Sequence, residues 1–512
     1  MNASSPTTAG PVLDQAARQP DAPALGDETG LRLTYGELAA AIRRTGDWLA
    51  SLGLSAGDRI MVIGENSAAL AVLLLAASHA GLRTVAENAR RMPAEVAGIL
   101  AHAMPRRVFV VHDQSDDAQA HADALGARPA QGPLPGRVSL AEPASPEHGD
   151  YAMPDDVALT IYTTGTTGQP KGVMLTHGGL CYIASMMARM RSIGPGDRVY
   201  GLLPVSHVMG HASVLLGSLH NGAYLHLASR FSPAQCTETL LREGITAVQG
   251  APAMFSKLAS HCRQAGIAGF PHVRFAAAGG APIDATVKAE AQAMLGCALH
   301  NGYGLTEAAS ICWTRMDEPN PDDSVGRPLP GVEVAIRDPQ GRDLPDGEVG
   351  ELWTRGPNLM RGYFRNEALT RQAVDAQGWF NTQDLARRDP DGRLFIVGRT
   401  KDVIIRSGFN VYPLEVETVL NAHPDVLHSA VIGRPVPGNE EVVAYVELAK
   451  GSTARAPDLA RHAAAALSPY KRPARIVIVP ALPLAANGKV LKSQLAQRFA
   501  HLDSADNQGD PA

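Results

Sequence analysis

The stretch that most constrains this chain is an apolar segment followed directly by a loop of hydroxyl groups and glycines. Residues 157–162 carry no charge and predict a buried strand. The next ten residues hold threonines, glycines and one lysine, with no large apolar side chain. Glycine N–H groups, threonine hydroxyls and a lysine ammonium can together surround a polyphosphate. The sequence therefore predicts a phosphate-binding loop made of Thr163, Thr164, Gly165, Thr166, Thr167, Gly168 and Lys171.

Two other interpretations of this loop are weaker. A flexible linker rarely follows a buried strand directly and carries a fixed Pro-Lys-Gly. A Walker A loop needs four residues between its first glycine and a Gly-Lys pair, and then Ser or Thr. Here Gly165 and Gly168 are too close, and Gly172 follows Lys171. An ordinary P-loop ATPase is therefore disfavoured.

Composition bounds the class of protein. A chain of 512 residues exceeds one usual core, so we expect two or more domains. The net charge of −5 shows no basic excess, and we expect neither nucleic acid nor anionic lipid as a partner. The five scattered cysteines form no C-x-x-C pair, which favours a reducing, cytoplasmic location. The most apolar stretch, residues 68–77, is too short to span a membrane and predicts a buried helix.

Predicted strands and helices alternate in the first part of the chain, which favours parallel α/β layers. The segments are residues 33–52 (helix), 59–63 (strand), 67–80 (helix), 108–111 (strand), 177–191 (helix), 199–203 (strand), 273–278 (strand) and 284–295 (helix). From Val325 onward, short strands separated by turn residues predict an antiparallel β-rich subdomain. We expect a loose tail over residues 1 to about 30 and a variable surface excursion over residues 113–150.

A second glycine-rich motif follows a predicted strand at residues 301–307. Tyr303 offers a flat face for a purine, and the flanking glycines allow it close to the backbone. Thr306 could reach a phosphate, and Glu307 could bind Mg²⁺, which prefers oxygen ligands. The same residues could instead form a glycine turn and the capped first turn of a helix. The residues alone do not choose between these interpretations.

His207 follows the predicted strand at residues 199–203. Ligand sites in open α/β sheets lie beyond the carboxyl ends of the strands, so His207 is a candidate site residue. A lone histidine there is more often structural. No acidic residue occurs from Val205 to Tyr224.

Together these motifs resemble the adenylate-forming superfamily, which includes acyl- and aryl-CoA synthetases, the adenylation domains of peptide synthetases, and luciferases. The matching segments stand in the family's order at residues 33–38, 163–171, 204–207, 303–307, 350–363, 378–384 and 483–490. The resemblance implies an α/β protein whose large N-terminal domain, residues 1–400, holds layered α/β subdomains and the β-rich subdomain. Lys401 would be a hinge, residues 402–502 a small mobile α/β domain, and residues 503–512 a disordered tail.

The resemblance also implies roles for single residues. Lys489 matches the catalytic lysine, and Thr306, Glu307 and His207 would complete the catalytic set, with Glu307 holding Mg²⁺. Asp384 would bind the ribose hydroxyls, since a carboxylate can accept from two at once. This sequence has Gln383 where the family usually has glycine before that aspartate. The further residues implied in ATP binding are Gly280, Ala281, Pro282, Asn301, Gly302, Tyr303, Gly304, Ile396 and Arg399.

The acyl pocket and the CoA site follow in the same way. The acyl pocket would be lined by His207, Val208, Met209, Ala212, Ala278, Gly279, Ala308 and Ile311. CoA would contact Ser407, Gly408, Lys471, Arg472 and Arg475, although basic patches are common on any surface. The pocket segments offer no acidic residue for an amino-acid ammonium and no arginine for a second carboxylate. We therefore expect an aromatic or medium-chain monocarboxylic acid.

The expected activity is ATP-dependent acid–CoA ligation through an acyl adenylate, with rotation of the C-terminal domain about Lys401 between the two steps. The expected small-molecule partners are the acid, ATP, Mg²⁺ and CoA, and both a monomer and a homodimer stay open. The alternatives are an adenylation enzyme that loads a carrier protein, a luciferase-like oxygenase, and a nucleotide-binding protein without turnover. The last would lack Lys489, Glu307 or Asp384, and all three are present.

Overall fold

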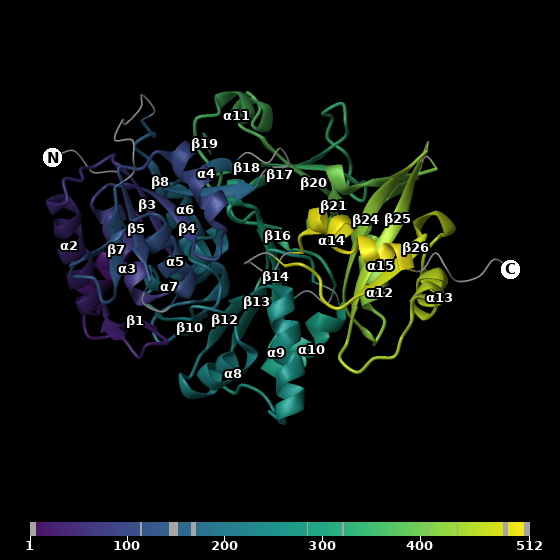
Figure 1. Ribbon diagram of the computed structural model, residues 1–512, viewed down its shortest axis with the longest axis horizontal. Coiled ribbons are helices and arrows are strands. Elements are labelled where there is room, and N and C mark those ends of the chain that lie inside the picture. Colours follow the sequence, from purple (N-terminus) through teal and green to yellow (C-terminus); the bar gives the residue numbers. More distant parts are fainter. Residues whose placement is uncertain are drawn as a thin grey trace.

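The computed structural model describes residues 7–112, 115–142, 152–164, 170–283, 285–319, 322–407, 409–437, 439–484 and 490–505. Two large sheets and the helices between them fill the N-terminal part of the chain (Figure 1). The C-terminal part lies to the right of them in that view and carries its own smaller sheets.

The first large sheet has eight strands and is mostly parallel at its centre. Alternate side chains of one strand enter different cores: Ile60 and Val62 face the main core, whereas Met61 and Ile63 pack in an outer cluster. This two-sided burial explains the continuous apolar run. The strands in spatial order are β19 (Gly362–Tyr363), β9 (Pro170–Thr176), β8 (Val157–Thr164), β4 (Arg83–Asn88), β3 (Arg59–Gly64), β5 (Arg107–Val111), β7 (Val138–Ala141) and β6 (Arg128–Ala130).

The second large sheet has nine strands and is also parallel at its centre. Its strands in spatial order are β16 (Arg327–Pro328), β15 (Cys312–Trp313), β14 (Leu299–Tyr303), β13 (Phe275–Ala278), β12 (Ala247–Gly250), β10 (Arg198–Gly201), β11 (Tyr224–Leu227), β1 (Pro23–Asp27) and β2 (Arg32–Thr34). On β13, Phe275 and Ala277 face the main core, and Ala276 and Ala278 face the opposite side.

Helices fill the space between the two sheets and cover their outer faces. Helix α3 (Ala68–His79) is buried from Ala68 to Ser78, because nearly every side chain in it is apolar. It shares the main core with α1 (Gly10–Arg18), α2 (Tyr35–Ser51), α6 (His177–Arg191), the π-helix η1 (Met209–Leu216) and α7 (Gly217–Leu219). The outer faces carry α4 (Pro93–Ala103) and α5 (Asp116–Ala124) on one sheet, and α8 (Pro233–Arg242), α9 (Pro252–Ala265) and α10 (Ala285–Leu295) on the other.

An antiparallel sheet follows, as predicted for the region after Val325. It contains β17 (Glu333–Arg337), β18 (Gly350–Arg355), β20 (Phe380–Arg388) and β21 (Leu394–Arg399), with α11 (Glu367–Ala373) between its strands in sequence. The short 3₁₀ turns η2 (Thr306–Ala308) and η3 (Thr400–Asp402) lie before and after this sheet in sequence.

The C-terminal part has a separate core around Val416, Val431 and Ala444. Its elements are β22 (Ile404–Arg406), β23 (Phe409–Val411), α12 (Pro413–Asn421), β24 (Val426–Val436), β25 (Asn439–Leu448), α13 (Ala456–Ala466), η4 (Pro469–Lys471), β26 (Arg475–Val479), η5 (Lys492–Gln494), α14 (Leu495–Arg498) and α15 (Ala500–Ala505). The predicted α/β fold, with a large N-terminal and a small C-terminal domain, is confirmed. The boundary at Lys401 stays a prediction.

Three segments that we expected to be largely irregular contain regular elements. The first 30 residues hold α1 and β1, and α1 is anchored because buried Thr8, just before it, donates its N–H to His177 Nδ1 at 3.1 Å. Residues 115–142 hold α5, β6 and β7, which extend the first sheet. Helix α15 runs three residues into the expected C-terminal tail. Polar and small residues form these elements because tertiary contacts outweigh their weak local preferences.

Candidate active site

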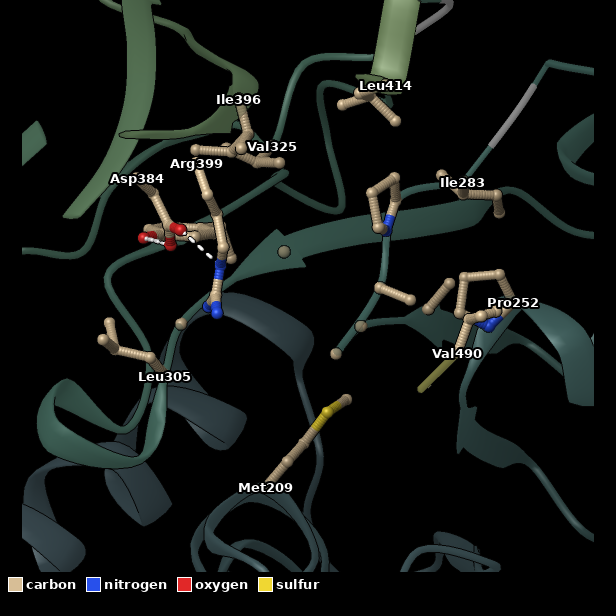
Figure 2. A pocket seen from close by; sticks show the side chains of 18 of the residues that line it. Met209, Pro252, Ile283, Leu305, Val325, Asp384, Ile396, Arg399, Leu414 and Val490 are labelled. Carbon is tan, nitrogen blue, oxygen red and sulfur yellow. Dashed lines mark hydrogen bonds and ion pairs between the residues drawn. The ribbon is translucent and has the colours of Figure 1, made fainter. Parts of the chain in front are cut away.

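One cavity of about 2800 Å³ collects the predicted motifs from five separate parts of the chain. Figure 2 shows Asp384 and Arg399 on one wall, Met209 reaching in from another, and Leu414 and Val490 of the C-terminal part on the far side. The predicted ATP-binding residues that line the cavity are Thr163, Lys171, Gly280, Ala281, Pro282, Asn301, Gly302, Tyr303, Gly304, Asp384, Ile396 and Arg399. The motifs lie far apart in sequence, so the fold itself assembles the site.

The phosphate loop joins two antiparallel strands. Thr163 pairs with Lys171, and the backbone of Thr164 pairs with Pro170, so β8 and β9 form a hairpin. A Walker A loop instead leads from a strand into a helix. Gly165, Thr166, Thr167, Gly168 and the Thr164 side chain lie outside the described residues.

An aromatic side chain connects this hairpin with Glu307. Tyr363 donates its hydroxyl to Glu307 Oε1 at 2.9 Å, and Lys171 Nζ lies 5.9 Å from the centre of the Tyr363 ring. Burial, together with the adjacent Glu307 carboxylate, raises the pKa of Tyr363, so its hydroxyl stays a donor. Sequence analysis gave Tyr363 no role, although it lies in a segment that resembles the family. Its contact partners come from two other motifs, which a local pattern does not reveal.

The opposite wall is built around a buried carboxylate. Tyr303 donates its hydroxyl to Asp384 Oδ2 at 2.5 Å, and Arg399 Nε lies 2.8 Å from Asp384 Oδ1. Asp384 is 5% exposed, and its two partners fix the orientation of both oxygens. Burial raises the pKa of Tyr303 well above its usual value, and the Asp384 charge adds to that shift. The predicted ribose-binding pair thus lies next to the predicted purine-binding tyrosine.

Gln383 occupies a backbone conformation that explains why glycine is usual at this place. Its φ of 58° lies in the left-handed region, which side chains rarely adopt. The Gln383 N–H donates to Asn381 Oδ1 at 2.8 Å, and this hydrogen bond supports the turn. The departure from the family pattern therefore keeps the loop geometry and carries local strain.

The turn after Tyr303 also has a tight backbone. A Cβ on Gly304 would lie 2.1 Å from the carbonyl oxygen of Ala309, so only glycine fits. Ala309 itself has a φ of 48° and a ψ of −82°, an unusual conformation for alanine. Thr306 and Glu307 both line the cavity directly after this turn. Where the alternative interpretation placed the first turn of a helix, the structure has the single 3₁₀ turn η2.

Only some of the residues predicted to form the acyl pocket line the cavity. Those that line the cavity are His207, Val208, Met209, Ala278 and Gly279. Ala212, Ala308 and Ile311 are instead buried in the main core, each 1% exposed or less, while Ala309 and Ser310 line the cavity. Residues 209–216 form a π-helix, whose wider turn shifts which side chains face inward.

Sequence analysis also missed an arginine. Arg191, the last residue of α6, lines the same cavity and is 2% exposed. The expectation that no arginine reaches the pocket was drawn from the motif segments alone and is wrong for the cavity as a whole. No sequence signal separates Arg191 from an ordinary basic residue in the last turn of a helix.

The residues predicted to bind CoA are not brought into this cavity. Lys471 Nζ lies 2.5 Å from Glu415 Oε1, and Arg472 donates to the carbonyls of Ala464 and Leu467. Ser407 has a φ of 52° and donates its N–H to Asn439 Oδ1 at 2.7 Å. Gly408 and Lys489 lie outside the described residues, as does Asp284 at the expected start of α10. Lys401 lines the cavity, whereas Arg475 does not appear in its wall.

Comparison with known proteins identifies the family. Residues 12–364 match the AMP-binding enzyme family, and residues 415–489 match the AMP-binding enzyme C-terminal domain. The chain belongs to the AMP-binding enzyme family. This confirms the predicted adenylate-forming superfamily, in its acyl- and aryl-CoA synthetase branch.

Similar proteins cover almost the whole chain. It is 32% identical over 500 residues to sulfoacetate–CoA ligase from Cupriavidus necator, covering 96% of this chain and 97% of that protein. It is 33% identical over 474 residues to a feruloyl-CoA synthase from Amycolatopsis sp, covering 92% and 94%. The crystal structure of ATP-bound MatB from Rhodopseudomonas palustris superimposes with a TM-score of 0.84 at 30% identity, covering 98% and 99%.

Two further findings concern the described part of the chain. None of its helices combines the length and the apolar character that a bilayer span requires. Within the same residues, no group of three or more His, Cys, Asp or Glu side chains is arranged to bind a metal ion.

Proposed function

We propose that this protein is an ATP-dependent, AMP-forming ligase that joins a carboxylic acid to coenzyme A. The observation that carries the proposal is the single cavity lined by Lys171, Glu307, Asp384 and His207, which come from four separate motifs. Membership of the AMP-binding enzyme family supports the first half of the reaction, and the CoA-ligase names of the relatives support the second.

In the first step, a carboxylate oxygen of the acid attacks the α-phosphorus of ATP. The bond from that phosphorus to the oxygen bridging it to the β-phosphorus breaks, and pyrophosphate leaves. Charge on the phosphate oxygens is stabilised by preorganised donors and cations. Lys171 and the hairpin loop would hold the β- and γ-phosphates, and Thr306 would contact the α-phosphate. Asp384 and Arg399 would hold the ribose.

Lys489 would neutralise charge at the reacting phosphate and carboxylate. The residues on either side of its segment, Leu484 and Val490, pair as an isolated antiparallel bridge and both line the cavity. Val490, the residue directly after Lys489, therefore lies at the cavity wall, which supports this role.

Glu307 fits a magnesium ion by its chemistry. It is one cavity-lining carboxylate, and Mg²⁺ is usually bound through one or two carboxylates together with substrate phosphates. Tyr363 donates to one oxygen of Glu307, which fixes the carboxylate and leaves lone pairs for a metal. When bound, Mg²⁺ would offset the negative charge of the phosphates.

In the second step, the CoA thiol attacks the acyl carbon of the adenylate. A carbon–sulfur bond forms, the carbon–oxygen bond to AMP breaks, and the thiol proton is released. The hinge at Lys401, the boundaries at residues 400 and 402, and the CoA contacts of Ser407, Gly408, Lys471, Arg472 and Arg475 are part of this proposal. Lys401 is exposed on a 3₁₀ turn between β21 and β22, where a backbone rotation needs few contacts to break.

A carrier protein is the second candidate acceptor. The pantetheine arm of a carrier protein would approach the adenylate in the same way as that of CoA. Lys471 and Arg472 already contact the Glu415 carboxylate and the carbonyls of Ala464 and Leu467 inside the C-terminal domain. Those contacts weaken the argument for recognition of free CoA phosphates. The predicted cytoplasmic location is also part of the proposal, and the five free cysteines support it.

The acid itself is the least constrained part of the proposal. The names of the relatives refer to sulfoacetate in one case and to ferulate or 4-coumarate in others. Met209, Ala278 and Gly279 would surround a mainly apolar body, as expected for an aromatic or medium-chain acid. One methylene more or less changes binding only modestly, so the lining does not fix the length.

The test is pyrophosphate release from Mg-ATP across aromatic, short, medium and long acids, with and without CoA. The proposal predicts acid-dependent release whose turnover rises on addition of CoA, with acyl-CoA as product. Adenylate that CoA does not discharge would move the assignment to the carrier-protein alternative. An intact protein that binds ATP and releases no pyrophosphate with any acid would contradict the proposal.

A further inference from the structure

Helix α6 ends with two arginines in different surroundings. Arg189 and Arg191 both lie in its last turn, but Arg189 is exposed and Arg191 is 2% exposed. The side chain of Arg191 reaches the wall of the active-site cavity. A helix-end arginine that only stabilised the helix dipole would gain nothing from this burial.

Two aromatic rings hold the Arg191 guanidinium in place. Its Cζ lies 5.3 Å from the centre of the Phe275 ring and 5.2 Å from that of Trp313. One terminal nitrogen donates to the carbonyl oxygen of Thr314. A guanidinium carries five N–H donors, so this single carbonyl satisfies a small part of its capacity. The rings fix the cation and shield it from water without neutralising it.

No carboxylate of the described residues neutralises the charge of the Arg191 guanidinium. Among the described residues, Arg191 forms no ion pair with Asp or Glu. The Thr314 carbonyl is its one hydrogen-bond acceptor there. Burial alone lowers the pKa of Arg191 to about 9, which still leaves it protonated at neutral pH. A buried cation without a counter-charge is costly, so an anionic ligand would be strongly favoured at this position.

Arg191 lies against Phe275 on β13, the strand that also carries the predicted acyl-pocket residue Ala278. Phe275 and Ala277 face the main core from β13, and Gln249 lies beside Ala277 in the parallel register of β12 and β13. Gln249, Ala277 and Ser213 of the π-helix all line the cavity with Arg191. Gln249 and Ser213 are buried polar residues, 3% and 2% exposed.

Small residues open the way to this end of the cavity. A Cβ on Gly302 would lie 2.8 Å from Trp313 Cδ1, so glycine lets the indole lie against β14 and contact the arginine. Ala277 and Ser213 present short side chains on the neighbouring elements. An acid whose carboxylate lies near the ATP site could therefore extend toward Arg191.

We propose that Arg191 binds a second anionic group, a carboxylate or a sulfonate, at the end of the acyl substrate away from the carboxylate that is activated. This inference rests on the proposed ligase function and names the class of its substrate. It replaces the expectation of a plain monocarboxylic acid, which was drawn from motif segments that contain no arginine. A guanidinium binds either oxyanion through two parallel hydrogen bonds.

The test uses acids of matched length that differ only at the far end: methyl, carboxamide, carboxylate and sulfonate, over a series of chain lengths. Values of kcat/KM from pyrophosphate release are compared for the wild type, Arg191→Met, Arg191→Lys and the matched control Arg189→Met. Binding is measured in parallel, without ATP, as the shift in thermal unfolding that each acid produces.

The wild type should prefer an anionic end over the carboxamide by about 10- to 100-fold, the range of a charged hydrogen bond. Arg191→Met should remove the preference through KM, Arg191→Lys should keep part of it, and Arg189→Met should keep all of it. The carboxylate and sulfonate arms show which oxyanion is preferred.

A wild type that prefers methyl or carboxamide ends would overturn the inference, even if Arg191→Met does not fold. So would an Arg191→Met variant that loses activity equally with all four ends, because that is the result of a purely structural role. If no acid releases pyrophosphate, the ligase proposal fails. The thermal shifts then still decide whether anionic ends bind at Arg191.

Discussion

Two of the arginines that line the cavity, Arg191 and Arg399, differ in the groups that contact the guanidinium. Arg399 lies 2.8 Å from Asp384, whereas Arg191 contacts a carbonyl and two aromatic rings. Burial would lower the pKa of Arg399, but attraction to Asp384 and Tyr303 raises it above its usual value. Burial lowers the pKa of Arg191 to about 9 without compensation. The protein uses the first cation to position its own carboxylate and leaves the second for a ligand.

Removing the charge of each arginine in turn tests this difference. Arg399→Met should lower the free energy of unfolding by about 2–4 kcal/mol, because it leaves Asp384 buried without its cation. Arg191→Met should raise it by about 1–3 kcal/mol in the absence of substrate, because an uncompensated cation is replaced by an apolar side chain of similar length. Urea unfolding measures both. Equal destabilisation by the two variants would contradict the contrast.

The proposed role of Arg399 in positioning Asp384 is tested by changing Asp384 itself. Asp384→Asn should raise the KM for ATP roughly 100-fold, because a neutral amide accepts less strongly from the ribose hydroxyls. The specific readout is discrimination against 2′,3′-dideoxy-ATP. The wild type should discriminate strongly and Asp384→Asn weakly. An unchanged discrimination ratio would show that Asp384 does not contact the ribose.

Glu87 is a buried acidic residue that, unlike Arg191, has an ion-pair partner, but this partner contacts only one of its two carboxylate oxygens. It is 2% exposed, its Oε2 lies 2.6 Å from Arg91 Nε, and its buried Oε1 has no hydrogen-bond partner among the described residues. Burial raises the pKa of Glu87 to about 7, and Arg91 offsets part of that shift.

The folded state therefore holds the Glu87 proton up to about pH 7, whereas the unfolded chain releases it near 4.5. The wild type should lose up to about 3 kcal/mol of stability from this group between pH 5 and 8. Glu87→Gln should flatten that dependence, and the exposed control Glu238→Gln should not. Unfolding free energies at pH 5 and pH 8 test this, and parallel slopes for wild type and Glu87→Gln would refute it.

The smallest expected effect concerns the backbone next to Asp384. Gln383→Gly should raise the free energy of unfolding by at most about 1 kcal/mol, because it relieves the positive φ but adds disorder to the unfolded chain. Gln383→Ala is the control, since alanine keeps the same strain. A similar gain in both variants would show that the side chain and not the backbone causes it.

Motifs whose chemistry is local were predictable from sequence. The threonine- and glycine-rich loop, the segment from Tyr303 to Glu307, and Asp384 each carry their residue types at fixed short spacing. The structure brings their described members to one cavity. The larger strands and helices also followed from runs of apolar residues, as in α3.

The rest depends on contacts between distant segments. Arg191 is buried by Phe275 and Trp313, which lie more than 80 residues further along the chain. Ala212 was assigned to the pocket through the resemblance of its segment to the family, but that segment forms a π-helix, whose wider turn buries Ala212 in the core. Ala308 and Ile311 lie on either side of Ala309 and Ser310, which line the cavity in their place, and Ala309 has an unusual φ of 48°.

The central claim is that the acid is activated as an acyl adenylate. The most direct measurement is the reaction of an acid labelled with ¹⁸O in its carboxylate, followed by mass analysis of the nucleotide product. An acyl-adenylate intermediate predicts one labelled oxygen in AMP, because the carboxylate oxygen that attacks the α-phosphorus leaves with AMP when the thiol attacks. Unlabelled AMP, or label in inorganic phosphate with ADP as the nucleotide product, would contradict it.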